Sequence, residues 1–170
     1  MSDQDGVTSA AITYNYIKKI NPEIDIRWTM HSGKQHGVEL DCVPQEAKLI
    51  IIPDAGSNQF EEHQTLKEHG FDILILDHHL CDKESTDACV INNQMGDYPD
   101  KDLSGAGVVY KFCSYFDKKY GYNFADEFLD LAAVGIIGDM MDLSNLETRY
   151  IIYNGLSNLK NYGLRRFALK

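Results

Sequence analysis

Short apolar runs that each end in an acidic residue, separated by longer amphipathic segments, constrain the fold of this chain most strongly. Residues 48–52 contain three consecutive isoleucines and lead through Pro53 to Asp54, and residues 72–76 lead to Asp77. Apolar runs of this length are typical of strands that are buried on both faces. Their alternation with helix-length segments predicts an α/β domain, with a doubly wound, mainly parallel sheet flanked by helices.

The rest of the chain divides into segments of the same two kinds. We expect further strands at residues 24–29 and 88–91, and helices at residues 7–20, 58–69, 105–119, 124–138 and 146–161. Pro22 ends the first helix, because its ring cannot continue the helical hydrogen bonds, and Gly70 ends the second. A length of 170 residues without an internal repeat or a low-complexity linker predicts one domain.

Composition excludes several classes of protein. With 44% hydrophobic and 25% charged residues the chain is typical of globular proteins, not of disordered, collagen-like or coiled-coil chains. Its 16 basic and 26 acidic residues give a net charge of −10, which argues against an extended surface for nucleic-acid phosphates. A nuclease remains compatible with this charge, because metal ions can hold its carboxylates together.

The chain shows no sign of export or membrane insertion. It has no apolar run of about 18 residues and no basic segment followed by an apolar one at its start. Its four cysteines form no CxxC pair. We therefore expect reduced thiols and a cytoplasmic protein without a membrane partner.

Acidic and histidine residues follow the predicted strands at the edge where ligands bind. Asp54 follows one strand and Asp77-His78-His79 another, and in open α/β sheets such positions converge in one crevice. Carboxylates crowded in a pocket raise one another's pKa values unless cations neutralise them. Oxygen ligands with one or two imidazoles suit Mn²⁺ or Mg²⁺, and two such ions about 3.5–4 Å apart commonly hydrolyse phosphate esters.

Three further aspartates lie at helix ends that can reach the same crevice. Asp3 and Asp5 precede the first helix, and Asp139 ends the apolar segment LAAVGIIGD. Each also has a structural interpretation, as a turn, a helix cap or a solvated helix end. The occurrence of all these residues in order, each at the end of an element, favours a two-metal site.

The same residues resemble the motifs of the DHH phosphoesterase superfamily. SDQDGVTSA, IIPDAGS, the Asp77-His78-His79 triplet and LAAVGIIGDMMDL occur in the family's order. The segment VINNQMGDYPDKDLSGAGVVYKF is similar to the stretch before the last motif in the RecJ group, the single-strand-specific exonucleases. Residues 31–37 resemble the RecJ loop that precedes the second motif.

This resemblance implies a set of metal ligands. Asp3 and Asp54 would hold one Mn²⁺ or Mg²⁺ ion. A second ion, which shares Asp54, would also be bound by three further residues: Asp5, His78 and Asp139.

The resemblance also implies roles around the scissile phosphate. His79 would face the phosphate as an electrophile or proton donor, and Asp77 would orient the histidines. Backbone donors of a close-approach loop would reach the substrate at three residues, which are Ser104, Gly105 and Gly107. Arg149 would contact a phosphate or, in the alternative interpretation, pair with Asp142.

Two departures from the family pattern lead to further expectations. Met1 stands where the family has a metal ligand, and no strand precedes the first motif. The residues after Arg149 do not supply the glycine-rich motif of the family's second domain. We therefore expect residues 1–170 to form the DHH catalytic domain without its first strand and without the C-terminal domain needed for substrate binding.

Three functions remain open at this point. The first is a metal-dependent phosphoesterase that acts as the catalytic domain of a RecJ-like exonuclease on single-stranded DNA, although the isolated chain can be inactive. The second is a hydrolase of short oligonucleotides or cyclic dinucleotides. The third is a catalytically impaired scaffold.

Overall fold

The described residues form a sheet of three parallel strands. A computed structural model describes residues 3–29 and 37–168, so Met1 and residues 31–36 of the expected RecJ-like loop lie outside the described residues. The strands are β1 (Leu49–Pro53), β2 (Asp72–Asp77) and β3 (Cys89–Asn92), in the order β1-β2-β3. The predicted α/β class is confirmed.

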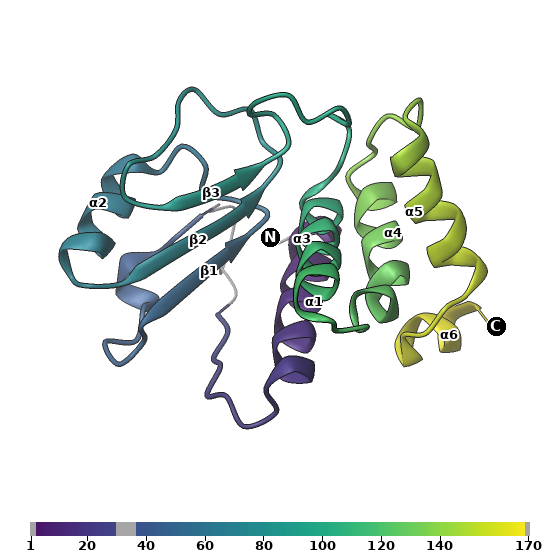
Figure 1. Cartoon of the computed structure of the whole chain (residues 1–170), viewed down its shortest axis with the longest axis horizontal. Helices are drawn as coiled ribbons and strands as arrows, with labels where there is room; N and C mark the ends of the chain where they lie inside the picture. The colour runs from purple at the N-terminus through teal and green to yellow at the C-terminus, as the bar shows by residue number, and fades with distance from the viewer. Residues whose placement is uncertain (1–2, 30–36, 169–170) are drawn as a thin grey trace.

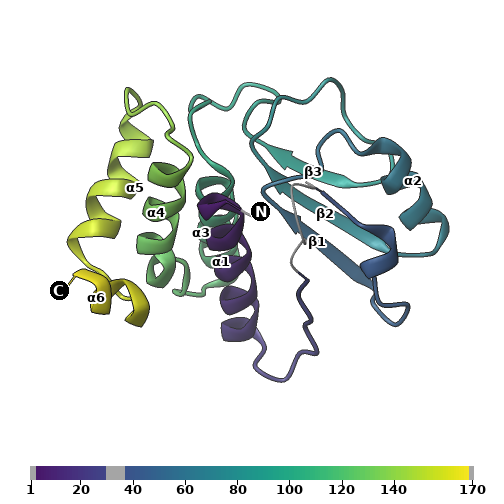
Figure 2. The same cartoon turned by 180° about the vertical axis from the view of Figure 1, so that it is seen from behind.

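Helices lie on both faces of this sheet (Figure 1). On one face lies α2 (Phe60–Glu68), and on the other lie α1 (Gln4–Ile20) and α3 (Gly105–Tyr120). Beyond them follow α4 (Leu129–Gly138), α5 (Leu146–Ser157) and α6 (Tyr162–Ala168). Two short 3₁₀ helices, Leu40–Cys42 and Ala125–Phe128, precede β1 and α4. Figure 2 shows the same order of layers from behind, with α1 in front.

The alternation of side chains along β2 builds a separate core on each face of the sheet. Ile73 and Ile75 pack with Leu66 of α2, whereas Leu74 and Leu76 point to the larger core that α1, α3 and α4 share. Consecutive residues of a strand point to opposite faces, so an uninterrupted apolar run is needed when both faces are covered. The run DILILD meets this need and places its final aspartate at the edge of the sheet.

Helix α4 is buried by neighbours on several sides, which fixes the position of its C-terminal aspartate. It packs against α1, α3 and α5. At Gly155 of α5, a Cβ would lie 2.4 Å from the carbonyl oxygen of Leu129, so only glycine allows α5 to approach α4 this closely. At the other end of α4, a Cβ on Gly138 would lie 2.6 Å from the side chain of Gln4, so the end of α4 lies next to the start of α1.

One expected strand is wrong, and one expected helix ends early. Residues 24–29 form no strand, and Ile24 and Trp28 are exposed. Alternation predicts a strand only where a sheet edge is available, and none of the described strands pairs with this segment. The helix expected at residues 146–161 ends at Ser157 and restarts as α6, because the backbone N–H groups of Lys160 and Asn161 donate to Asp130 instead of continuing the helix.

Two further observations concern membrane-spanning helices and the cysteines. Within residues 3–29 and 37–168, no helix has the length and apolar character needed to cross a membrane. All four cysteines are free thiols, and Cys113 is buried in the larger core.

Candidate metal centre

Asp77, the last residue of β2, orients the two histidines that follow it. Its Oδ1 accepts hydrogen bonds from the backbone N–H of His78 (2.8 Å) and from Nδ1 of His79 (2.7 Å). Its Oδ2 accepts from the backbone N–H of Ser57 (3.0 Å). Burial opposes ionisation, but the hydrogen bonds from His79 and Ser57 outweigh it and hold the pKa of Asp77 well below its usual range.

His79 presents its ring to solvent. Its side chain is 56% exposed. The hydrogen bond to Asp77 raises the pKa of His79 to about 9, against the opposing effect of partial burial. Because Nδ1 is taken by Asp77, Nε2 is the nitrogen available to a ligand or a substrate.

Asn92 supports this turn and was missed by the sequence analysis. It pairs in register with Asp77 at the end of β3, and its amide donates to Oγ of Ser57 and to the carbonyl oxygen of His79, both at 2.9 Å. A polar residue directly after the predicted strand at residues 88–91 was the signal that could have identified it.

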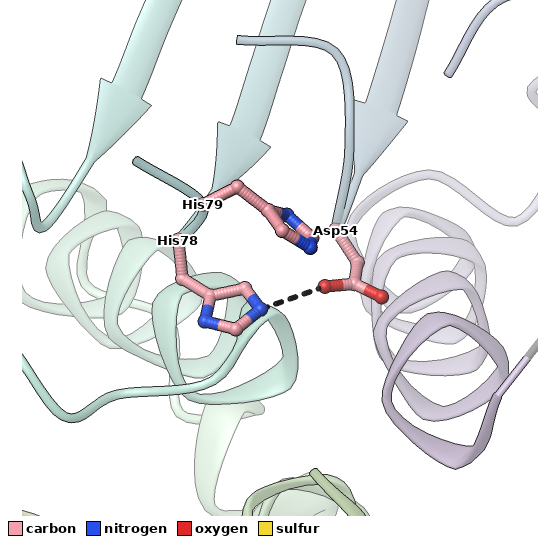
Figure 3. Close-up of side chains that lie close together, drawn as sticks. All are labelled: Asp54, His78 and His79. Carbon is pink, nitrogen blue, oxygen red and sulfur yellow. Dashed lines mark ion pairs between the residues drawn. The ribbon is translucent and has the colours of Figure 1, made fainter. Parts of the chain in front are cut away.

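Asp54 follows β1 and points at His78 (Figure 3). Its backbone has a φ of 62°, in the left-handed region that aspartate and asparagine tolerate better than most residues. Oδ1 of Asp54 lies 3.3 Å from Nε2 of His78, yet this buried oxygen has no hydrogen-bond partner among the described residues. Burial raises the pKa of Asp54 to about 7, and the charge of Asp5 adds to this while His78 opposes it.

A glycine at the start of α3 makes room for Asp54. A Cβ on Gly105 would lie 2.3 Å from Oδ1 of Asp54, far inside contact distance. The close approach of α3 to the end of β1 therefore requires glycine at this position.

Asp5 is held by the N-terminus of α3. It is buried in the first turn of α1 and accepts hydrogen bonds from the hydroxyl of Ser104 (2.7 Å) and from the backbone N–H groups of Gly105 (2.6 Å) and Ala106 (3.0 Å). Free N–H groups and the helix dipole favour a negative charge there. The residues predicted to bind substrate, Ser104 and Gly105, thus hold a metal-ligand candidate, while Gly107 packs against Leu103.

His78 stands at the centre of the acidic residues. In addition to Asp54, its Nε2 faces Oδ2 of Asp139 (3.5 Å) and Oδ2 of Asp5 (3.7 Å). Burial disfavours the charged imidazole, but Asp54 and Asp5 outweigh it and raise the pKa of His78. Burial, together with the charges of Asp5 and Asp3, raises the pKa of Asp139.

Two overlapping groups of side chains have the spacing of metal ligands. One contains Asp54, His78 and His79, the other contains Asp5, His78 and Asp139, and within each group the ligand atoms lie within 4.8 Å of one another. Asp3, the N-cap of α1, is exposed, accepts from the backbone N–H of Gly6 (2.9 Å) and belongs to neither group.

The donor set fits a hard divalent cation. Carboxylate oxygens with one or two imidazoles suit Mn²⁺ or Mg²⁺. The buried Oδ1 of Asp54 has an open acceptor position, and an adjacent cation would supply the partner that it lacks.

Arg149 lies apart from these residues, on α5. Its Nη2 donates to the carbonyl oxygen of Ser144 (3.2 Å), and within the described residues it forms no ion pair with Asp142. The alternative pairing with Asp142 is therefore wrong, and a phosphate contact stays a prediction.

Comparison with known proteins identifies the family. Residues 1–136 match the DHH family, N-terminal domain. The chain belongs to the DHH family. This match begins before the first aspartates and ends within α4, before Asp139.

Several DHH relatives are named exonucleases. The chain is 47% identical over 170 residues to an SPbeta prophage-derived protein of Bacillus subtilis named for single-strand DNA-specific exonuclease activity. It is 33% identical over 175 residues to the single-stranded-DNA-specific exonuclease RecJ of Bacillus subtilis. These matches cover 99% of this chain but 30% and 21% of the two relatives, so the chain spans less than a third of their length.

Solved DHH structures share the fold. An exonuclease RecJ crystallised with manganese superposes with a TM-score of 0.80 at 26% identity, over 91% of this chain and 41% of that protein. RecJ from Thermus thermophilus, solved in complex with Mn²⁺, superposes with a TM-score of 0.69 at 23% identity, over 91% of this chain and 23% of that one. The predicted resemblance to RecJ is confirmed.

Proposed function

We propose that this chain forms the metal-binding catalytic domain of an exonuclease that hydrolyses phosphodiester bonds in single-stranded DNA. The observation that carries the proposal is the crowding of buried carboxylates around His78, with an acceptor position left open on Asp54. Buried acids are normally satisfied by hydrogen bonds, as Asp5 is here, and a cation would supply the partner that Oδ1 of Asp54 lacks. The names of the relatives supply the substrate class.

The metal ligands follow from the two groups of side chains. Asp54 would be the shared ligand, with Asp5, His78 and Asp139 on one side and Asp3 completing the other, as the family resemblance implies. When bound, divalent cations lower the pKa of a water molecule and stabilise negative charge on a phosphate.

His79 and Asp77 would act on the substrate side. Asp77 fixes the ring of His79 through Nδ1, so that Nε2 can donate a hydrogen bond to a phosphate oxygen or a proton to the leaving group. Ser104 and Gly105 would position Asp5, and any contact of Ser104, Gly105 or Gly107 with substrate is a separate prediction. Arg149 would contact a phosphate further along the strand.

Hydrolysis assays with Mn²⁺ test this function. The substrates are a 5′-labelled single strand of 20 nucleotides, the same sequence as a duplex, a dinucleotide and a cyclic dinucleotide. We expect the single strand to be shortened from an end, and this activity to be lost with EDTA and in His78→Ala. His79→Gln should retain Mn²⁺ binding but lose most of the activity.

Two other results would change the proposal. Hydrolysis of only the dinucleotide or the cyclic dinucleotide would replace the substrate by the short nucleotides of the second hypothesis. Metal binding without hydrolysis of any of the four would contradict a catalytic role for this chain and favour the scaffold.

We also propose a cytoplasmic location for the protein. Free thiols at all four cysteines support a reducing, cytoplasmic location. The expected dependence on a C-terminal substrate-binding domain stays a prediction.

A further inference from the structure

The charge of the chain is divided unevenly along its length. All 26 acidic residues lie in residues 1–148. Residues 149–170 contain no acidic residue and five of the 16 basic ones. In a chain with a net charge of −10, the part of α5 after Thr148 and all of α6 therefore carry no acidic side chain that would repel a polyanion.

The same two helices expose four aromatic rings. Tyr153 is 73% exposed and Phe167 is 84% exposed, and Tyr150 and Tyr162 are also well exposed. The α5 rings border an open groove together with Arg149. On α6, the guanidinium of Arg166 lies 5.7 Å from the centre of the Tyr162 ring.

We propose that α5 and α6 form a binding track for single-stranded DNA outside the metal centre. The track consists of Tyr150, Tyr153, Tyr162, Arg165, Arg166 and Phe167. Exposed rings stack on bases without regard to sequence, and cations beside them neutralise the phosphates, which is how many proteins hold single strands. The inference rests on the proposed function for the identity of its ligand.

The position of the track suits a strand that leads to the metal centre. Helix α5 begins at Leu146, shortly after Asp139, and runs antiparallel to α4 towards α6 at the far end of the molecule (Figure 1). Its 12 residues span about 18 Å. That length accommodates roughly five stacked nucleotides at about 3.4 Å each.

Binding measured without metal tests the track. Fluorescence anisotropy of a fluorescein-labelled dT20 in EDTA reports the Kd with no hydrolysis. We expect Tyr153→Ala combined with Phe167→Ala to weaken binding about tenfold or more, because each stacked ring contributes substantially. Arg165→Gln combined with Arg166→Gln should lower the slope of log Kd against log salt by about 1.4, since each lost phosphate contact removes about 0.7.

A matched control exists on α3. Tyr115 is exposed, and the ammonium of Lys119 lies 5.8 Å from its ring centre, but this pair lies outside the track. Tyr115→Ala combined with Lys119→Gln should bind dT20 as the unmodified chain does. Circular dichroism checks that all variants are folded.

The outcomes separate this inference from the proposed function. Absence of dT20 binding by the folded chain, equal binding by the track variants, or an equal loss in the control pair would overturn the track. A shift from dimer to monomer in the track variants, with unchanged dT20 binding, would assign the face to a second copy of the chain. Binding through the track without Mn²⁺-dependent hydrolysis would retain the track and contradict the nuclease.

Discussion

The two ends of α4 each carry a buried or partly buried aspartate, and the two are used differently. At the start of the helix, Asp130 is 1% exposed and accepts hydrogen bonds from three backbone N–H groups, those of Leu131 (2.8 Å), Lys160 (2.7 Å) and Asn161 (2.6 Å). At the other end, Asp139 faces His78 among further carboxylates. Asp130 therefore finds its hydrogen-bond partners within the protein. Asp139 belongs to a cluster in which Oδ1 of Asp54 lacks such a partner.

Asp100 repeats the pattern of Asp130. It is buried and accepts from the backbone N–H and the hydroxyl of Thr148 and from the backbone N–H of Asp102. Both residues anchor loops, and neither belongs to the two groups of side chains that have the spacing of metal ligands. Burial of an acid therefore does not by itself indicate a ligand, but crowding around an imidazole with an open acceptor position does.

The largest effect on stability is expected at Asp130, at the start of α4. Asp130→Ala leaves the backbone N–H groups of Lys160 and Asn161 without a partner, which should lower the free energy of unfolding by about 3 kcal/mol. Urea denaturation followed by circular dichroism measures this. Asp130→Asn, which keeps one acceptor oxygen, should cost less, and a fully stable Asp130→Ala would remove the distinction between the two ends of α4.

Asp54→Asn, in contrast to Asp130→Ala, should raise the free energy of unfolding of the metal-free protein. The raised pKa of Asp54 means that its charge is unfavourable in the folded state, and asparagine tolerates the same left-handed backbone. In EDTA at pH 8 we expect the free energy of unfolding to rise by about 2 kcal/mol. Destabilisation of similar size would show that Asp54 is a structural acid like Asp130.

The same carboxylate predicts a pH dependence of the metal-free chain. Because the folded pKa of about 7 lies above the unfolded value, the folded state binds more protons between these two values. Stability in EDTA should therefore fall as pH rises from about 4 to 7. Asp54→Asn should flatten this part of the profile, and an unchanged profile would contradict the assignment to Asp54.

Gly105→Ala should disturb the metal centre through sterics alone. The added Cβ meets Asp54 at 2.3 Å, so Asp54 must move, and Mn²⁺ affinity should fall about tenfold. Calorimetry measures the affinity. Gly107→Ala is the matched control, because its Cβ would meet Leu103 at 3.1 Å and no member of the metal centre.

The smallest effect is expected at His63, a buried histidine outside the cluster. Burial lowers the pKa of His63, so it folds in the neutral form, and its Nδ1 lies 3.0 Å from Oγ of Ser85. The free energy of unfolding is therefore highest above the pKa that His63 has in the unfolded chain. It decreases as the pH falls from that value towards the pKa of His63 in the folded chain. His63→Gln should reduce this loss between pH 7 and 5 without a change in Mn²⁺ affinity.

Much of the sheet and of its polar edge could be predicted from local pattern. The runs that end in Asp54 and Asp77 are long enough to report burial on both faces, and the edge of a parallel sheet brings such residues together. Residues 24–29 alternate equally well but find no strand to pair with, and alternation carries no information about a partner.

The partners of individual polar groups could not be predicted. Ser104 and Gly105 have the composition of a phosphate-binding turn, yet their donors face Asp5, which is about a hundred residues away in the chain. Asp130 and Asp100 went unnoticed for the same reason, because their partners Lys160, Asn161 and Thr148 lie far along the chain. Which acid is satisfied and which is not depends on tertiary contacts.

Titration of Mn²⁺ into the metal-free chain by calorimetry tests the central claim most directly, with Asp54→Asn, His78→Ala and Asp130→Asn as the three variants. We expect one or two ions to bind to the unmodified chain and to Asp130→Asn, and binding to be lost in Asp54→Asn and His78→Ala. Two results would contradict a metal centre at the carboxyl edge of the sheet. Either the folded chain binds no Mn²⁺ at millimolar concentration, or the unmodified chain and all three variants bind Mn²⁺ with equal affinity.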